Sequence, residues 1–333
     1  MATLSTGSLT IADIAKRTDP NGSAAMIAEL LTQTNAILND IPWYMSNQPT
    51  SHQTTSRTSL PTPTWRNYNA GIASTKSTTG QSQEQMGMLE DLSEVDIAVA
   101  SLGGNLGANR LNEGKAHIEG MGQEMTQTLF LGNSGVNPEE FTGFAPRFNA
   151  LTGTTSQNVI SGGGSGSDNS SIYLVGWAAN KVYGIYPPGT TAGLVHRDLG
   201  EQIITVSAGL GGTRMLAYVD HFKWYAGLAV EDWRFVVRIC NIDISNLVAK
   251  SSAADLFDLM IKATHRIPSL EACNPVFYLN RTCFQMLDIQ GRDDVQTGGQ
   301  LTYGEVAGKR LPFFRGIPAR LVDQLTETEA TVA

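Results

Sequence analysis

The feature that most constrains the fold is an amphipathic segment that begins at Gly107 and ends in a loop at Leu151. Its apolar residues recur at helical spacing and share one stripe, namely Leu111, Ile118, Met121, Met125 and Leu129. Most of the polar residues fall outside that stripe, namely Glu113, Glu119, Gln123, Glu124 and Gln127. We therefore predict a helix of roughly 33 Å, capped by Asn109 and stopped by Gly132.

Three glycines interrupt this predicted helix. Gly114, Gly120 and Gly122 each cost about 1 kcal/mol relative to alanine in a helix interior. Helix propensity alone would not keep such a segment straight, so another surface must pack along it. A long core helix of an ordinary domain explains this segment equally well, so the role of the helix has to be inferred from the rest of the sequence.

The N-terminal part is predicted to be an arm followed by a helix. Residues 1–22 are small and polar, and a helix starts at the potential cap Ser23 and ends before Asp40 and Pro42. One face of that helix is apolar, through Met26, Ile27, Leu30, Leu31, Ile37 and Leu38. Trp43, Tyr44 and Met45 follow as a compact apolar anchor.

Nearly half of the residues from Thr50 to Ser82 are Ser or Thr. This composition is typical of a flexible linker. The Thr-rich flanks also suit strands, and the interspersed Leu60, Trp65, Tyr68 and Ile72 favour a long hairpin. A two-stranded ribbon has no core of its own, so an ordered hairpin would lie on something else, such as a neighbouring subunit.

The rest of the chain mixes strands and helices. A strand is predicted over Met86–Val99, and the Gly/Ser-rich run at 158–171 is predicted to be a surface loop. Strands dominate from Ile172, and a helix is predicted from its cap Ser252 to His265. After the segment 275–280, a helix is expected at 281–290 and strands at 301–306, 309–316 and 317–323. The fold class expected is α+β.

Length and charge restrict the classes of function. A chain of 333 residues exceeds one usual core, so we expect two or three lobes. The net charge of −8 and the absence of a basic run argue against tight nucleic-acid binding. Three cysteines without a CxxC pair suit buried free thiols in a reducing compartment, and neither a secretory signal nor a membrane span is expected.

No catalytic, cofactor or metal site is predicted. His196-Arg197-Asp198-Leu199 matches the start of a kinase catalytic loop, but Ile203 replaces the metal-binding Asn, so a polar turn between strands is the better interpretation. The five histidines lack metal spacing, and Asp220-His221 on a predicted strand suits a structural histidine. Glu139-Glu140 resembles a carboxylate pair but is better explained by caps or subunit contacts.

The order of these elements resembles the major capsid proteins of tailed bacteriophages with the Hong Kong 97-type fold. The resemblance covers nearly the whole chain and is strongest at Leu129–Asn149, Trp177–Pro187, Asp220–Ile242 and Leu311–Asp323. It implies an N-terminal arm and helix at 1–48 and an extended hairpin loop at 49–88. It also implies a peripheral domain at 89–150 with a spine helix at about 107–131, a β-rich axial domain at 151–250, and closing elements at 251–333.

This resemblance implies a structural role without enzyme activity or cofactors. Copies would assemble as hexamers and pentamers into an icosahedral shell that encloses phage double-stranded DNA without tight binding. A separate scaffolding protein, a portal and a decoration protein are the implied partners, with assembly in the host cytoplasm and no membrane. The candidate inter-subunit contacts are Trp43, Tyr44, Leu60, Trp65, Tyr68, Glu139, Glu140 and Phe141.

Some relatives form a Lys–Asn isopeptide crosslink from this hairpin. Lys76 is the only lysine between Pro49 and Met88, and neither an Asn partner nor a catalytic Glu can be assigned, so no crosslink is predicted. Two alternatives remain, an encapsulin-like nanocompartment shell and a β-rich hydrolase. The hydrolase would need a catalytic Ser or a carboxylate pair that the sequence does not supply.

Overall fold

The computed structural model of the chain describes residues 31–101, 106–153, 155–205, 214–293, 301–306 and 309–333. The chain divides into two compact units. The smaller unit comprises Met1–Thr34, Met88–Thr126 and Gly193–Tyr225, and the larger comprises Asn35–Gly87, Gln127–Ala192 and Ala226–Ala333. Three long elements, β3, α4 and β8, contribute residues to both units.

The larger unit is built on a seven-stranded sheet. Its strands follow the order β11 (Leu301–Val306), β12 (Lys309–Phe314), β13 (Ile317–Leu321), β10 (Asn274–Leu279), β5 (Asn169–Trp177), β9 (Val236–Asp243) and β4 (Val159–Ser161). β5 is antiparallel to β9 and β10, whereas β10 pairs with β13, and β4 with β9, in parallel. Every residue of β5 is buried, which explains its nearly continuous run of apolar and small residues.

Three helices accompany this sheet, α6 (Ile244–Ala249), α7 (Leu256–Arg266) and α8 (Arg281–Asp293). α7 packs against β9 and α8, and its predicted inner residues Leu256, Leu259, Met260 and Ala263 are buried. The predicted cap Ser252 was wrong. Ser252 has a φ of 52°, in the left-handed region, and the Asp255 side chain caps the helix by accepting from the Asp258 N–H.

An aromatic cluster fills the space between the sheet and the end of α4 (Leu106–Leu131). The Phe130 ring lies 5.0 Å from Tyr173 and 5.9 Å from Phe144 of α5 (Phe144–Arg147). The indole nitrogen of Trp177 donates to the hydroxyl oxygen of Tyr278 at 2.8 Å, so this buried polar atom is satisfied. The loop after the predicted long helix is therefore anchored in the core.

A second sheet contains β1 (Trp43–Met45), β6 (Val182–Tyr186), β8 (Arg214–Val230), β3 (Thr78–Asp96) and β2 (Ser51–Ser59), in that order. β1 is parallel to β6, and β6 is antiparallel to the end of β8. The predicted anchor of Trp43, Tyr44 and Met45 is therefore an edge strand.

The helix predicted from Ser23 to Asp40 is correct only in its last turn. Its start lies outside the described residues, residues 31–36 are not helical, and α2 covers only Ile37–Asp40. The backbone of Asn35 forms a bridge with Val322, which replaces a helical turn by a sheet-like contact. Ile37 is fully buried, whereas Leu31 is 81% exposed, so the predicted apolar stripe does not face one surface.

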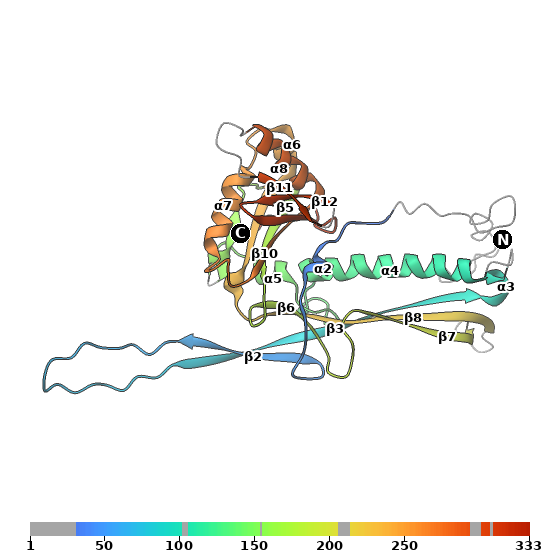
Figure 1. Cartoon of the computed structure of the whole chain (residues 1–333), viewed down its shortest axis with the longest axis horizontal. Helices are drawn as coiled ribbons and strands as arrows, with labels where there is room; N and C mark the ends of the chain where they lie inside the picture. The colour runs from blue at the N-terminus through green and yellow to red at the C-terminus, as the bar shows by residue number, and fades with distance from the viewer. Residues whose placement is uncertain (1–30, 102–105, 154, 206–213, 294–300, 307–308) are drawn as a thin grey trace. The chain divides into compact units, whose positions relative to one another are not determined.

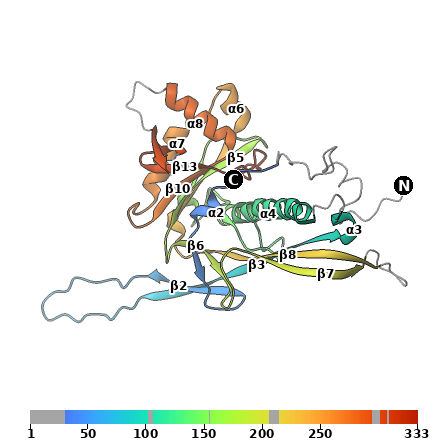
Figure 2. The same cartoon turned by 45° about the vertical axis from the view of Figure 1, so that its right-hand side comes forward.

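The Ser/Thr-rich segment forms the projecting hairpin. β2 and β3 pair in antiparallel register from Ser51 opposite Gln85 to Ser59 opposite Thr78. In Figures 1 and 2, no other element of its unit lies beside the distal part of this ribbon. Residues 60–77, which we call the tip, contain no regular strand. Of the two interpretations of this segment, the ribbon is confirmed.

The smaller unit contains the first part of α4, the end of β3, α3 (Ile97–Ala100), and β7 (Leu194–Thr205) paired with β8. The predicted strand over Met86–Val99 is too long, because β3 ends at Asp96, whose carboxylate caps α3. The string from His196 to Leu199 lies within β7 and not in a turn, so that prediction was wrong.

The predicted long helix is confirmed, with a different start. α4 begins at Leu106, and Asn109 lies inside it, where its amide donates to the Ala100 carbonyl at 3.1 Å. Gly132 ends the helix as predicted. Met121, Met125 and Leu129 are buried, but Leu111 and Ile118 are 60% and 45% exposed, so only three of the five residues of the apolar stripe are buried by the chain itself.

Candidate functional site

The root of the hairpin is fixed by a charged pair. Arg147 donates two hydrogen bonds to the Glu84 carboxylate of β3, both at 2.6 Å, and a third to the Leu228 carbonyl at 3.4 Å. Both side chains are largely buried, which makes this bidentate contact stronger than an exposed ion pair. Nothing in the sequence links two residues 63 positions apart, so the pair could not be predicted.

Polar side chains continue this anchoring outward along the hairpin. The His52 ring and the Tyr183 hydroxyl are 3.0 Å apart, and the same hydroxyl donates to Glu231 at 2.8 Å. Burial, followed by this bond to Glu231, raises the pKa of Tyr183. Thr54 and Ser82 pair across the strands at 2.7 Å. The Ser and Thr residues that suggested a linker thus hold the ribbon together without an apolar core.

The tip presents large apolar side chains to solvent. Leu60, Trp65, Tyr68 and Ile72 are between 66% and 105% exposed in the isolated chain. Several exposed aromatic and aliphatic residues on one segment mark a surface that binds a partner. Leu60, Trp65 and Tyr68 were predicted contact residues, and their exposure leaves them available to a neighbour.

The other predicted contact residues differ in their exposure. Tyr44 is 42% exposed and stacks edge-on against Tyr183 at 5.2 Å, whereas the Trp43 ring packs against Gly184. Glu139 is exposed. Glu140 accepts a hydrogen bond from Asn137, and Phe141 is only 3% exposed. The Phe141 side chain thus packs within its own chain.

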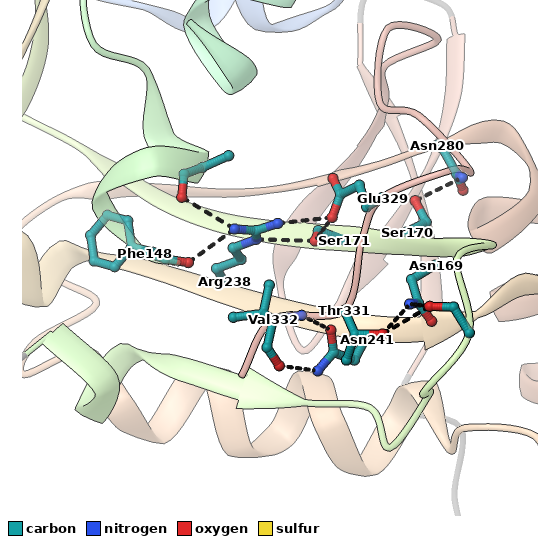
Figure 3. A network of polar contacts seen from close by, with 12 residues as sticks. Phe148, Asn169, Ser170, Ser171, Arg238, Asn241, Asn280, Glu329, Thr331 and Val332 are labelled. Atoms are coloured by element: carbon teal, nitrogen blue, oxygen red, sulfur yellow. Dashed lines mark hydrogen bonds and ion pairs between the residues drawn. The ribbon is translucent and has the colours of Figure 1, made fainter. Parts of the chain in front are cut away.

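The larger unit contains a buried polar network (Figure 3). The guanidinium of Arg238 donates to Glu329 at 2.8 Å, to Ser171 at 3.1 Å and to the Phe148 carbonyl at 3.0 Å. Ser171 also donates to the Glu329 carboxylate. Both charged side chains are less than 10% exposed, so each neutralises a charge that would otherwise be buried alone.

The same network ties down the segment around residues 329–332. The Asn241 side chain donates to the Val332 carbonyl and accepts from its N–H, both at 2.8 Å (Figure 3). Asn169 donates to Thr331 at 3.3 Å and Asn280 to Ser170 at 3.0 Å. These contacts attach the segment to β5 and β9.

The Gly/Ser-rich run at 158–171 was predicted to be a surface loop, and that prediction was wrong at both ends. The first residues form β4, and Asn169, Ser170 and Ser171 form the fully buried start of β5. Burial of polar residues is possible here because the network supplies hydrogen-bond partners for the Asn169 amide nitrogen and for the Ser170 and Ser171 hydroxyls. Only residues 162–168 form the loop.

The smaller unit has its own charged cluster. Arg110 of α4 contacts Asp198 and Asp220 of β7 and β8, both at 2.8 Å, and the Arg110 hydrogen bond lowers the pKa of Asp198. His196 also contacts Asp220 at 3.0 Å. These residues line a cavity of about 360 Å³ together with Leu111, Ile118 and Phe222. Since Arg110 engages both carboxylates, the kinase-like string serves to hold β7 against the helix.

The described residues contain no candidate metal cluster, and their cysteines form no disulfide. None of their His, Cys, Asp and Glu side chains form a group of three that could hold a metal ion. All three cysteines are free, and burial raises the pKa of the Cys283 thiol to about 12. Among the helices in the described ranges, none is both long and apolar enough to cross a bilayer.

A family model and a solved structure each match nearly the whole chain. The family model of major capsid protein GP7 matches residues 19–333. The solved structure of bacteriophage epsilon15 is similar at 36% identity and a TM-score of 0.77, and the match covers 100% of this chain and 99% of that one. No curated protein matches the chain.

Two further solved structures are similar at much lower identity. The bacteriophage JBD30 capsid is 10% identical, with 92% of this chain and 93% of that chain covered and a TM-score of 0.45. The SrpI encapsulin complex of Synechococcus elongatus is 11% identical, with 70% and 96% covered and a TM-score of 0.43. These two scores are too low to add to the assignment.

The projecting hairpin, the long helix and the two sheets confirm the predicted α+β class, and the family match favours a phage capsid over a nanocompartment. The chain therefore belongs to the family of the major capsid protein GP7, and it is a phage major capsid protein of the Hong Kong 97-type fold whose copies form an icosahedral shell.

Proposed function

We propose that the copies assemble as hexamers and pentamers in which each hairpin lies across a neighbouring copy. The exposed tip is the observation that carries this proposal. A ribbon fixed by Arg147 and Glu84 at its root and exposing Trp65 and Tyr68 at its tip lacks a surface to cover within its unit. A copy related by rotation can supply that surface, and such heterologous contacts close into rings.

The finer division of the chain is also part of this proposal. The peripheral domain is assigned to residues 89–150 around the long helix, and the axial domain to the β-rich residues 151–250. Residues 1–48 form the arm and 49–88 the hairpin loop, while 251–333 close both domains. The exposed Leu111 and Ile118 of α4 support a peripheral domain that packs against other copies.

The shell is proposed to enclose double-stranded DNA without binding it tightly. The net charge of −8 supports this, since like charge keeps a packaged polyanion from adhering to the wall. A separate scaffolding protein, a portal and a decoration protein are the proposed partners, and assembly takes place in the host cytoplasm. The protein is proposed to act without enzymatic activity.

The test removes the exposed apolar groups of the tip and keeps its length. In one variant Leu60, Trp65, Tyr68 and Ile72 all become Ser. The matched control replaces two exposed apolar residues elsewhere, Val136 and Leu270, by Ser. Sedimentation and electron microscopy then measure the fraction of protein in closed shells, and circular dichroism verifies folding.

We expect the tip variant to fold normally and to form few shells, because assembly loses the burial of four large side chains per copy. The control is expected to assemble like the unaltered chain. Shells formed at normal yield by the tip variant would contradict the proposed role of the hairpin.

A further inference from the structure

The hairpin and the segment that follows it carry opposite charges. From Ile41 to Lys76 the sequence contains no Asp or Glu but includes Arg57, Arg66 and Lys76. From Ser77 to Asn109 it contains no Lys or Arg but includes five acids, Glu84, Glu90, Asp91, Glu94 and Asp96. In a chain with a net charge of −8, a basic segment of this length next to an acidic one is a pattern that complementary surfaces use.

The basic groups of the hairpin, of which Arg66 and Lys76 lie in the tip, are exposed to a partner. Arg57, Arg66 and Lys76 are exposed, and none of them forms an ion pair with a described residue. The Arg66 guanidinium donates to the Ala70 carbonyl at 3.0 Å, which holds it beside the exposed aromatic residues of the tip. The tip therefore combines positive charge with large apolar side chains.

The end of β3 offers the matching chemistry. Because alternate residues of a strand share one face, Met88, Glu90, Leu92, Glu94 and Asp96 point the same way. Met88 and Leu92 are 53% and 49% exposed. We call these five residues the acidic face.

The charges of the acidic face are only partly neutralised. Glu90 meets Lys223 at 2.6 Å, and Asp96 accepts a hydrogen bond from the Ala98 N–H. Glu94 has no ion pair with any described residue. Its carboxylate is therefore available to a cation of another copy, and the exposed Met88 and Leu92 can pack against aromatic side chains.

We propose that the tip of each hairpin docks on the acidic face of β3 in a second copy of the chain. Arg66 and Lys76 meet Glu94 and Asp96, while Trp65 and Tyr68 cover Met88 and Leu92. Since each copy carries both the tip and the acidic face, the contact repeats from copy to copy in one direction. This inference rests on the proposed docking of the hairpin and names its receiving surface.

The test exchanges the charges. A tip-reversed variant carries Arg66→Glu and Lys76→Glu. A swapped variant adds Glu94→Lys and Asp96→Asn, where the asparagine retains the helix cap. A control variant carries Arg197→Glu and Arg214→Glu, two exposed residues outside both surfaces, and has the same change in net charge as the tip-reversed variant.

We expect the tip-reversed variant to lose shells and the swapped variant to regain them, with the control close to the unaltered chain. Like charges placed in contact should weaken each contact by about tenfold or more, an effect that multiplies around a ring. Sedimentation measures the shell fraction, and circular dichroism with a thermal melt verifies that every variant folds.

Two results would overturn the inference while leaving the proposed function in place. One is normal assembly of the tip-reversed variant, when the Ser-substituted tip variant still fails to assemble. The other is a folded swapped variant that assembles no better than the tip-reversed one, which would place the docking surface elsewhere. In the first case, shells that fill poorly with DNA would assign the basic residues to the nucleic acid.

Discussion

Arg238 and Glu329 are the clearest case of a single pair that holds distant parts of the chain together. The pair joins β9 to a segment 91 residues later in the chain, and both side chains are buried. A buried pair adds little net stability compared with apolar residues, but the loss of one partner leaves an uncompensated charge in the interior. The penalty for breaking it should therefore be large.

We predict that Arg238→Gln lowers the free energy of unfolding of the unassembled chain by about 3–5 kcal/mol. The matched control is Arg281→Gln, because Arg281 pairs with Asp323 while 68% exposed and should lose at most about 1 kcal/mol. Urea unfolding followed by circular dichroism gives both values. Equal losses in the two variants would show that the network does not hold the segment.

Residues of this kind limit what the sequence predicts. Periodicity located the apolar core positions Met121, Met125 and Leu129, because packing leaves a repeating pattern. Arg238, Arg147 and Arg110 were missed, since long-range charge pairs leave no pattern in the chain. Of the predicted contact residues, Phe141 is buried by its own chain, a property that depends on tertiary structure.

At the scale of elements, the long helix, the hairpin and most strand segments along the chain were predictable, whereas the order of the strands in the two sheets was not predicted. Each has a local signal, such as the period of α4 or the strand-like alternation in β8. The errors lie where tertiary contacts override local preference. Residues 31–36 form a bridge in place of a helix, and Asn169 to Ser171 are buried by a polar network.

The pairing of β1 with β6 depends on a glycine. The Cβ of an alanine at position 184 would lie 2.5 Å from the Trp43 ring. We predict that Gly184→Ala displaces β1 and destabilises the chain by about 1–3 kcal/mol, the usual cost of overpacking. Thermal unfolding and limited proteolysis at residues 43–45 measure the effect.

Gly71→Ala is the control for this prediction, because a Cβ at position 71 has no neighbour within 4 Å. It should leave both measurements unchanged. A Gly184→Ala variant that melts and resists protease like the unaltered chain would show that β1 is not fixed by the contact between Trp43 and Gly184.

At the scale of the whole molecule, the features left uncovered in one copy have a common explanation. The tip, the acidic face and the apolar residues Leu111 and Ile118 of α4 all keep large exposed surfaces in the described part of the chain. Membership in the major capsid protein family explains them, since a shell subunit completes its surfaces with other copies. Composition predicted this only in outline, because low charge and a ribbon without a core indicate partners but do not identify them.

The central claim is that this chain builds closed shells from many copies. The most direct measurement is size exclusion followed by negative-stain electron microscopy of the purified chain, alone and with a scaffolding partner. We predict capsomer rings or closed icosahedral particles. A monomer of 35.8 kDa that persists under both conditions would contradict the account.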